Sequence, residues 1–188
     1  MITRVCVFCG SKDGDSPKFL EAATTFGRAL AEHQLDLVYG GAAHGLMGAV
    51  AGAVLAGGRH VIGVVPRNLS RQEFAHPELS EHVLVETMYE RKAKMAEAAD
   101  AFVALPGGFG TVDELFDMLT AAQVGLHRKP IGLLDLDGYY APLLTWIAQA
   151  LQRGFIPSGL KDVLLVRSTP EELVRALLTH QPPAFSLR

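Results

Sequence analysis

Short apolar runs alternate with longer amphipathic stretches along the chain. The runs are rich in β-branched residues and predict strands, whereas the longer stretches have the spacing of helices. We expect strands at Arg4–Cys9, Asp36–Tyr39, His60–Val65, His82–Val85, Ala101–Leu105, Pro130–Leu134 and Val163–Val166. We expect helices at Pro17–His33, Gly45–Ala56, Met88–Ala98, Val112–Val124, Tyr139–Arg153 and Pro170–Thr179. This alternation predicts an α/β fold with a doubly wound, mostly parallel sheet.

The length of 188 residues suits one domain, and the chain shows no repeat or linker. We therefore expect a single nucleotide-binding α/β domain over residues 1–180 and a short tail at 181–188. Val61–Val65 and Ala101–Leu105 are almost continuously apolar, which is typical of strands covered by helices on both faces. The polar interval Arg67–Glu81 is long enough to be a functional loop.

Charge and cysteine usage exclude several classes of protein. A net charge of −3 disfavours a nucleic-acid surface, because such surfaces usually carry a basic excess. No apolar run reaches the roughly 18 residues of a membrane span, and no signal peptide is recognisable, so we expect a cytoplasmic protein. Cys6 and Cys9 lie three apart in one expected strand and would point to opposite faces, which predicts buried structural thiols and no metal site.

The clearest chemical motif is the glycine-rich turn from Pro106 to Thr111, between an expected strand and an expected helix. Glycines let the backbone approach an anion, and the start of a helix offers unpaired N–H groups and a positive dipole end. The turn therefore predicts a site for a nucleotide phosphate at Gly107, Gly108, Phe109, Gly110 and Thr111. It lacks the lysine of a P-loop and the spacing of a G-x-G-x-x-G turn, and an ordinary tight turn is the alternative.

Two further motifs are expected at the same edge of the sheet, where ligands of open α/β folds bind. Tyr39–Gly48 again runs from strand through glycines to helix, so Gly41 could line the same pocket, whereas His44 suits a helix start or the surface. Met88–Lys92 opens a helix with Arg91 and Lys92. Cations oppose the dipole at a helix start, so the pair suggests a nearby anion, the alternative being a solvated charged face.

Glu114 has two interpretations. Thr111–Glu114 fits a capping box, in which the fourth residue accepts a hydrogen bond from the cap N–H. Because Glu114 lies one turn from the phosphate turn, it could instead hold a carboxylate beside the sugar of the ligand. The sequence leaves both interpretations open.

Together these motifs resemble the LONELY GUY (LOG) family of cytokinin riboside 5′-monophosphate phosphoribohydrolases. The most specific matches are P-G-G-F-G-T-x-x-E from Pro106 and M-x-x-R-K from Met88. Further matches are F-C-G-S at Phe8–Ser11, V-Y-G-G at Val38–Gly41, G-L-M-G at Gly45–Gly48, G-G-R-H-V-I-G-V at Gly57–Val64, K-P-I-G-L-L at Lys129–Leu134 and D-G-Y-Y at Asp137–Tyr140. The chain departs from the usual family pattern at Lys12, Ala42 and Asp113.

The resemblance implies a Rossmann-like fold. It also implies an enzyme that removes ribose 5-phosphate from an N6-modified adenosine monophosphate, or from AMP, without a cofactor. It implies that Arg91 and Glu114 are the catalytic pair. The motifs and the resemblance together give these substrate contacts: Ser11, Gly41, Glu73, Met88, Lys92, Gly107, Gly108, Phe109, Gly110 and Thr111. Family members have also been called lysine decarboxylases, but we find no lysine with an acidic partner suited to a pyridoxal ring.

A homodimer or larger homo-oligomer is the expected assembly. The resemblance implies it, and the apolar residues Leu115, Phe116, Met118 and Leu119 offer more than one buried face on a single helix. A nucleotide or cofactor carrier on the same fold is the alternative function, because a fold alone does not fix an activity. Such a carrier would need neither Arg91 nor Glu114.

Overall fold

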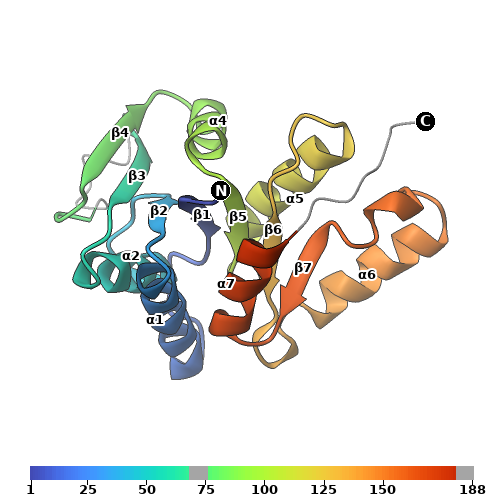
Figure 1. The fold of residues 1–188 in the computed structure, drawn as a ribbon, viewed down its shortest axis with the longest axis horizontal. Coiled ribbons are helices and arrows are strands. Elements are labelled where there is room, and N and C mark those ends of the chain that lie inside the picture. The colour runs from blue at the N-terminus through green and yellow to red at the C-terminus, as the bar shows by residue number, and fades with distance from the viewer. Residues whose placement is uncertain (68–75, 181–188) are drawn as a thin grey trace.

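The computed structural model of the chain describes residues 1–67 and 76–180. Seven parallel strands form one sheet in the order β4-β3-β2-β1-β5-β6-β7 (Figure 1). The strands are β1 (Arg4–Phe8), β2 (Asp36–Tyr39), β3 (Val61–Pro66), β4 (Glu81–Val85), β5 (Ala101–Ala104), β6 (Ile131–Leu134) and β7 (Leu164–Arg167). The helices are α1 (Pro17–Glu32), α2 (Gly45–Ala56), α4 (Met88–Ala98), α5 (Phe109–Gln123), α6 (Ala141–Gln152) and α7 (Pro170–Thr179), with short 3-10 helices η1 (Leu136–Gly138) and η2 (Ser158–Leu160).

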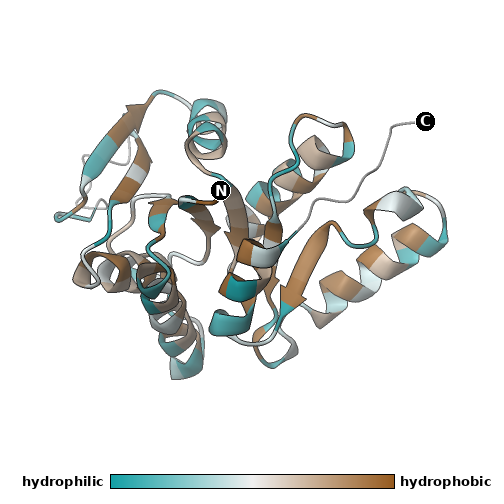
Figure 2. Ribbon diagram, viewed as in Figure 1, coloured by the Kyte–Doolittle hydropathy of each residue, from teal (hydrophilic) through white to brown (hydrophobic). Residues whose placement is uncertain are grey.

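Helices cover both faces of the sheet, as the apolar strands require (Figure 1; Figure 2). Residues of α1, α2 and α7 pack with Val5 and Val7 of β1 into one core cluster. Residues of α4 and α5 pack with Cys6 and Phe8 into the other. Alternate residues of β1 therefore enter opposite layers, as the period of a strand dictates.

The predicted burial of the two cysteines is confirmed. Cys6 and Cys9 are buried free thiols, and they belong to different core clusters. Burial raises the pKa of both thiols well above their ordinary value, so both stay protonated at neutral pH and behave as apolar packing groups.

The strand order has a topological switch point between β1 and β5. β2, β3 and β4 follow one another on one side of β1, whereas β5, β6 and β7 follow on the other side. In such a sheet the crevice for a ligand lies beyond the carboxyl ends of the two strands at the switch point. A hydrogen bond of 3.0 Å from the Gly10 N–H to the Pro106 carbonyl joins the loops that leave these two strands.

The parallel sheet and the alternating elements confirm the predicted fold. The largest difference concerns α5, which begins at Phe109 and not at Val112.

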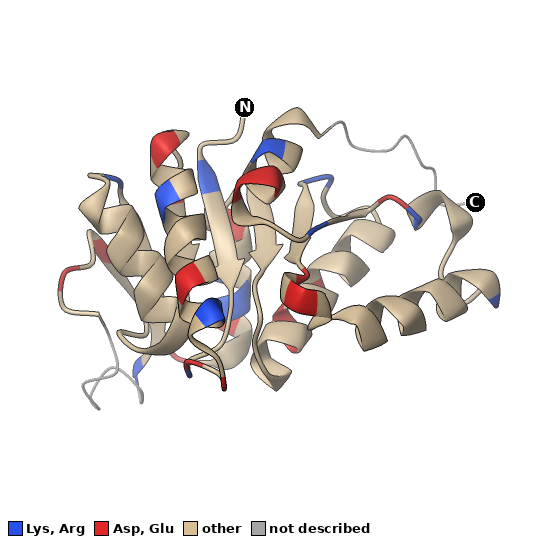
Figure 3. Ribbon diagram, turned by 90° about the horizontal axis from the view of Figure 1, so that it is seen from below, with Lys and Arg blue, Asp and Glu red and all other residues tan. Residues whose placement is uncertain are grey.

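Acidic and basic positions are interspersed over the helices and loops (Figure 3). Within the described residues, no helix is long and apolar enough to cross a membrane. The predicted tail, 181–188, lies outside the described residues, as does Glu73.

Candidate active site

The glycine-rich turn leaves the start of α5 open. Gly108 is the N-cap residue with an extended backbone, and no side chain caps the helix. The first hydrogen bond of the helix runs from the Val112 N–H to the Gly108 carbonyl, at 3.2 Å. Among the described residues, no acceptor is found for the N–H groups of residues 108–111. These donors and the helix dipole form a site suited to an anion.

The glycines of this turn have different physical roles. A Cβ atom at Gly107 would overlap Thr111 Oγ1 and would lie 2.8 Å from the Gly10 nitrogen, so a side chain does not fit there. Cβ atoms at Gly108 and Gly110 would meet nothing within 4 Å. Gly107 is therefore needed for close packing of the turn. Gly108 and Gly110 leave free space above the helix start.

Arg91 of α4 and Glu114 of α5 form a buried ion pair at this edge. The Arg91 Nη1 atom lies 2.7 Å from Glu114 Oε1, and the two side chains are only 8% and 7% exposed. The Arg91 Nε atom also donates to the Val64 carbonyl of β3, at 3.1 Å. Burial raises the pKa of the Glu114 carboxyl, although the attraction of Arg91 acts in the opposite direction. A carboxylate with a raised pKa is a stronger base than an exposed glutamate.

The capping interpretation of Glu114 is wrong. The N-cap is Gly108, so Glu114 lies in the second turn of α5, and its Oε1 atom accepts from Arg91. The solvated-face alternative is wrong for Arg91 as well, because this residue is 7% exposed. The negative charge expected beside Arg91 and Lys92 comes from carboxylates of α5.

Lys92 contacts two other carboxylates of α5. Its Nζ atom lies 3.0 Å from Asp113 Oδ2 and 2.5 Å from Asp117 Oδ2. The hydrogen bond to Asp117 is the main cause of a raised pKa for Lys92, so its charge persists at neutral pH. The adjacent residues Arg91 and Lys92 thus fix α4 against α5 through three ion pairs.

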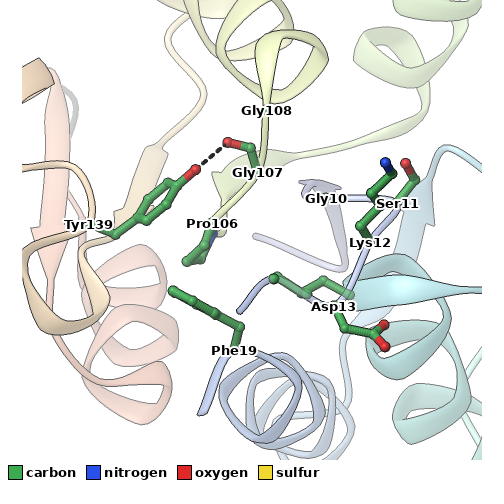
Figure 4. A pocket seen from close by; sticks show the side chains of 11 residues that line it. Gly10, Ser11, Lys12, Asp13, Phe19, Pro106, Gly107, Gly108 and Tyr139 are labelled. Atoms are coloured by element: carbon green, nitrogen blue, oxygen red, sulfur yellow. Dashed lines mark hydrogen bonds between the residues drawn. The ribbon is translucent and has the colours of Figure 1, made fainter. Parts of the chain in front are cut away.

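A cavity of about 270 Å³ opens at the carboxyl ends of β1 and β5 (Figure 4). Its walls come from the loop after β1, the turn after β5, the starts of α1 and α2, and Tyr139. The lining residues are Gly10, Ser11, Lys12, Asp13, Gly14, Phe19, Leu46, Pro106, Gly107, Gly108 and Tyr139. The structure therefore brings the predicted contacts Ser11, Gly107 and Gly108 together. Arg91 and Glu114 do not line this cavity.

The other predicted contacts are spread around the same edge. Gly41 is buried with a φ of 82°, and a Cβ atom there would overlap Val65. Met88 is 50% exposed and Phe109 is 97% exposed, each as the first residue of its helix. His44 is an exposed N-cap residue of α2, as predicted.

Sequence reasoning missed two residues that support the site. A Cβ atom at Gly40 would overlap the Arg91 Nη2 atom, so the guanidinium occupies the space of the missing side chain. The Tyr139 hydroxyl donates to the Gly107 carbonyl at 2.8 Å. Both residues belong to motifs of the sequence, V-Y-G-G and D-G-Y-Y. Neither motif indicates that Gly40 makes room for Arg91 or that Tyr139 contacts Gly107.

The electrostatics of the site suit a sugar phosphate and a developing positive charge. Unpaired N–H groups can hold the phosphate, and a buried carboxylate can stabilise a cation nearby. No group of three or more His, Cys, Asp or Glu residues suited to a metal ion occurs in the described part of the chain. The fold and the site thus define a Rossmann-like α/β protein with an anion-binding turn and a buried Arg–Glu pair.

Comparison with known proteins places this architecture in a family. The family described as "Possible lysine decarboxylase" matches residues 47–177. The cytokinin riboside 5′-monophosphate phosphoribohydrolase LOG7 of Arabidopsis thaliana is 49% identical over 95% of this chain and 82% of its own length. The phosphoribohydrolase LOG of rice, Oryza sativa subsp. japonica, is 47% identical over 95% of this chain and 74% of its own length. The chain belongs to the LOG family.

The fold itself is shared more widely. A molybdenum cofactor binding protein from Rippkaea orientalis superimposes with a TM-score of 0.70, over 95% of this chain and 99% of its own. The two sequences are only 20% identical, so this likeness concerns the fold alone.

Proposed function

We propose that this protein is a hydrolase that cleaves the N-glycosidic bond of N6-modified adenosine 5′-monophosphates. The products are the free base and ribose 5-phosphate. The observation that carries the proposal is the buried pair of Arg91 and Glu114, 2.7 Å apart, next to an uncapped helix start. The names of LOG7 and of the rice relative support the same reaction.

The phosphate is assigned to the turn after β5. The N–H groups of Gly108, Phe109, Gly110 and Thr111 are the donors, and Gly107 brings the turn close to the loop after β1. Ser11 lines the same cavity and would add a hydroxyl donor. Gly41, Glu73, Met88 and Lys92 stay predicted contacts, with Lys92 acting at least in part through the carboxylates of α5.

The chemical step follows from the charge of the pair. Cleavage of the bond between C1′ and the base builds positive charge on the ribose, as in glycoside hydrolysis. Glu114 is assigned to stabilise that charge and to orient or deprotonate the attacking water. The hydroxyl of water joins C1′, and a proton goes to the departing base. Arg91 holds Glu114 in place and is available to assist the leaving group.

The test is the release of free base from AMP and from isopentenyladenosine monophosphate, followed by chromatography. The proposal predicts release from at least one of them, with equimolar ribose 5-phosphate. Removal of the 5′-phosphate should lower kcat/KM by about tenfold or more, since charge-assisted hydrogen bonds contribute about 1.5–3 kcal/mol each. Binding without any release would favour the carrier alternative. Equal kcat/KM values for nucleoside and monophosphate would refute the phosphate assignment.

A homodimer or larger homo-oligomer is part of the proposal. Leu115 and Met118 lie in the core, whereas Phe116 and Leu119 lie on the face of α5 that is turned toward α6, with Leu119 also packed against the core. That face borders an apolar cavity of about 220 Å³ with walls from α5, α6 and η2, where Trp146 is 52% exposed. Such an exposed apolar surface is typical of an interface.

Light scattering tests the assembly. Trp146→Glu should weaken it, whereas Leu178→Glu, on the exposed side of α7, is a control with the same charge. A monomeric unmodified protein at micromolar concentration would contradict the proposal. The cytoplasmic location stays a prediction from the sequence.

A further inference from the structure

Two consecutive tyrosines hold the backbone on which the phosphate turn is built. The Tyr139 hydroxyl donates to the Gly107 carbonyl at 2.8 Å (Figure 4). The Tyr140 hydroxyl donates to the Leu105 carbonyl, also at 2.8 Å. Both tyrosines lie between η1 and α6, so a segment more than thirty residues away in sequence fixes the turn.

The hydrogen bond from Tyr139 determines the orientation of the Gly107–Gly108 peptide plane. This peptide is trans, so its carbonyl and its N–H point in opposite directions. Its carbonyl is held by the tyrosine, and its N–H belongs to Gly108, a donor without an acceptor among the described residues. Glycines on both sides give this peptide more rotational freedom than other residues would. A bond from outside the turn is therefore needed to keep the N–H aimed at one place.

Tyr139 is itself held in position. Its ring packs edge-on against Phe19 of α1 and against Tyr140, with centroids 5.7 Å and 4.8 Å apart. The Tyr140 N–H donates to Asp135 Oδ1 at 2.7 Å, which fixes the backbone just after Tyr139. The hydroxyl thus comes from an ordered ring on the wall of the cavity, not from a freely rotating side chain (Figure 4).

We propose that Tyr139 is a positioning residue for the phosphate: its hydroxyl presets the Gly107–Gly108 peptide so that the Gly108 N–H donates to the 5′-phosphate. The inference rests on the proposed function only through the phosphate site. Without the hydroxyl, the glycine peptide rotates among orientations, and the bound phosphate must select one of them. The result is a loss of affinity that depends on the phosphate group.

The test compares Tyr139→Phe with Tyr140→Phe by calorimetric titration. Each variant loses one hydroxyl and one 2.8 Å bond to a carbonyl. The Tyr140 hydroxyl also interacts with the backbone N–H of Gly107, which belongs to the preceding peptide, so only the Tyr139 bond lies on the Gly107–Gly108 donor peptide. Tyr139→Phe should weaken the binding of AMP and of ribose 5-phosphate by about fivefold, the effect of one hydrogen bond, with adenosine binding changed less than about twofold. Tyr140→Phe should lower the melting temperature, because its hydroxyl is buried, and should leave the ratio of AMP affinity to adenosine affinity unchanged.

Other outcomes contradict the proposal in distinguishable ways. If the unmodified protein binds AMP but Tyr139→Phe binds AMP equally well, Tyr139 does not position the turn, and the proposed function stands. If both variants lose AMP affinity alike, the tyrosines act only through general stability, which also refutes the inference. If the unmodified protein binds neither AMP nor ribose 5-phosphate, the phosphate site fails, and the proposed function fails with it.

Discussion

Replacement of Glu114 by glutamine separates the charge of the site from its shape. Glutamine has almost the same volume and keeps an oxygen that can accept the 2.7 Å bond from Arg91. It carries no negative charge, so it can neither stabilise a developing sugar cation nor act as a base. We therefore expect a folded protein that still binds AMP and turns over at least about 100-fold more slowly, the usual scale for such groups.

The effect on stability should be small because two electrostatic effects oppose each other. The substitution abolishes the attraction to Arg91 but also the cost of burying a carboxylate that is 7% exposed. Burial raises the pKa of the Glu114 carboxyl and the attraction of Arg91 opposes this rise, while glutamine keeps an acceptor for the buried guanidinium. We expect the free energy of unfolding to change by less than about 2 kcal/mol. Glu114→Ala also removes the acceptor and leaves Arg91 buried without its partner, which should cost about 3–5 kcal/mol.

Three measurements on one preparation test this reasoning. Thermal melting reports folding, calorimetry reports AMP affinity, and chromatography reports base release. A Glu114→Gln protein with normal melting and a turnover within about tenfold of the unmodified protein would show that the charge is not used in catalysis. A loss of turnover that accompanies a loss of folding would leave Glu114 a structural residue.

Three further results are expected. Arg91→Lys should lower kcat/KM by about tenfold or more, because lysine cannot donate to Glu114 and the Val64 carbonyl with the same planar geometry; unchanged kinetics would refute this. Gly40→Ala should displace the Arg91 guanidinium and lower turnover. The control Gly52→Ala, in a helix with open space around this residue, should leave stability unchanged or raise it by about 1 kcal/mol. Equal turnover in the two variants would contradict the prediction. The acid limb of the plot of kcat against pH should lie above pH 4.5, because the pKa of Glu114 is raised and its active anion is therefore protonated at a higher pH than that of an ordinary glutamate. Phosphorus NMR of bound AMP separates this ionisation from that of the phosphate.

The fold could be predicted from local pattern because burial on both faces leaves a strong signal. Val61–Val65 is apolar at nearly every position and lies within the fully buried β3, which is shifted by one residue from the predicted strand His60–Val65. The start of α5 was less predictable. A glycine-rich turn is expected to lie outside a helix, yet Phe109 and Gly110 have helical backbones. The helix starts there without a side-chain cap, at residues that are exposed to solvent.

The site was only partly predictable because its partners are distant in sequence. Thr111–Glu114 is a valid local capping pattern, and nothing within it reveals that Glu114 contacts a residue 23 positions earlier. The same holds for Gly40, whose missing side chain makes room for Arg91, and for Tyr139, which reaches Gly107 from 32 positions away. Motif matching identified the segments that matter, but tertiary contacts define what each residue does.

A crystal structure of Glu114→Gln bound to isopentenyladenosine monophosphate would show whether the turn and the ion pair form one active site. We expect the 5′-phosphate at the start of α5, within hydrogen-bond distance of N–H groups between Gly108 and Thr111. We also expect C1′ of the ribose beside the glutamine that replaces Glu114, with the Arg91 guanidinium adjacent. A nucleotide bound with its phosphate elsewhere, or with C1′ remote from position 114, would contradict the assignment of this turn and this ion pair to one active site.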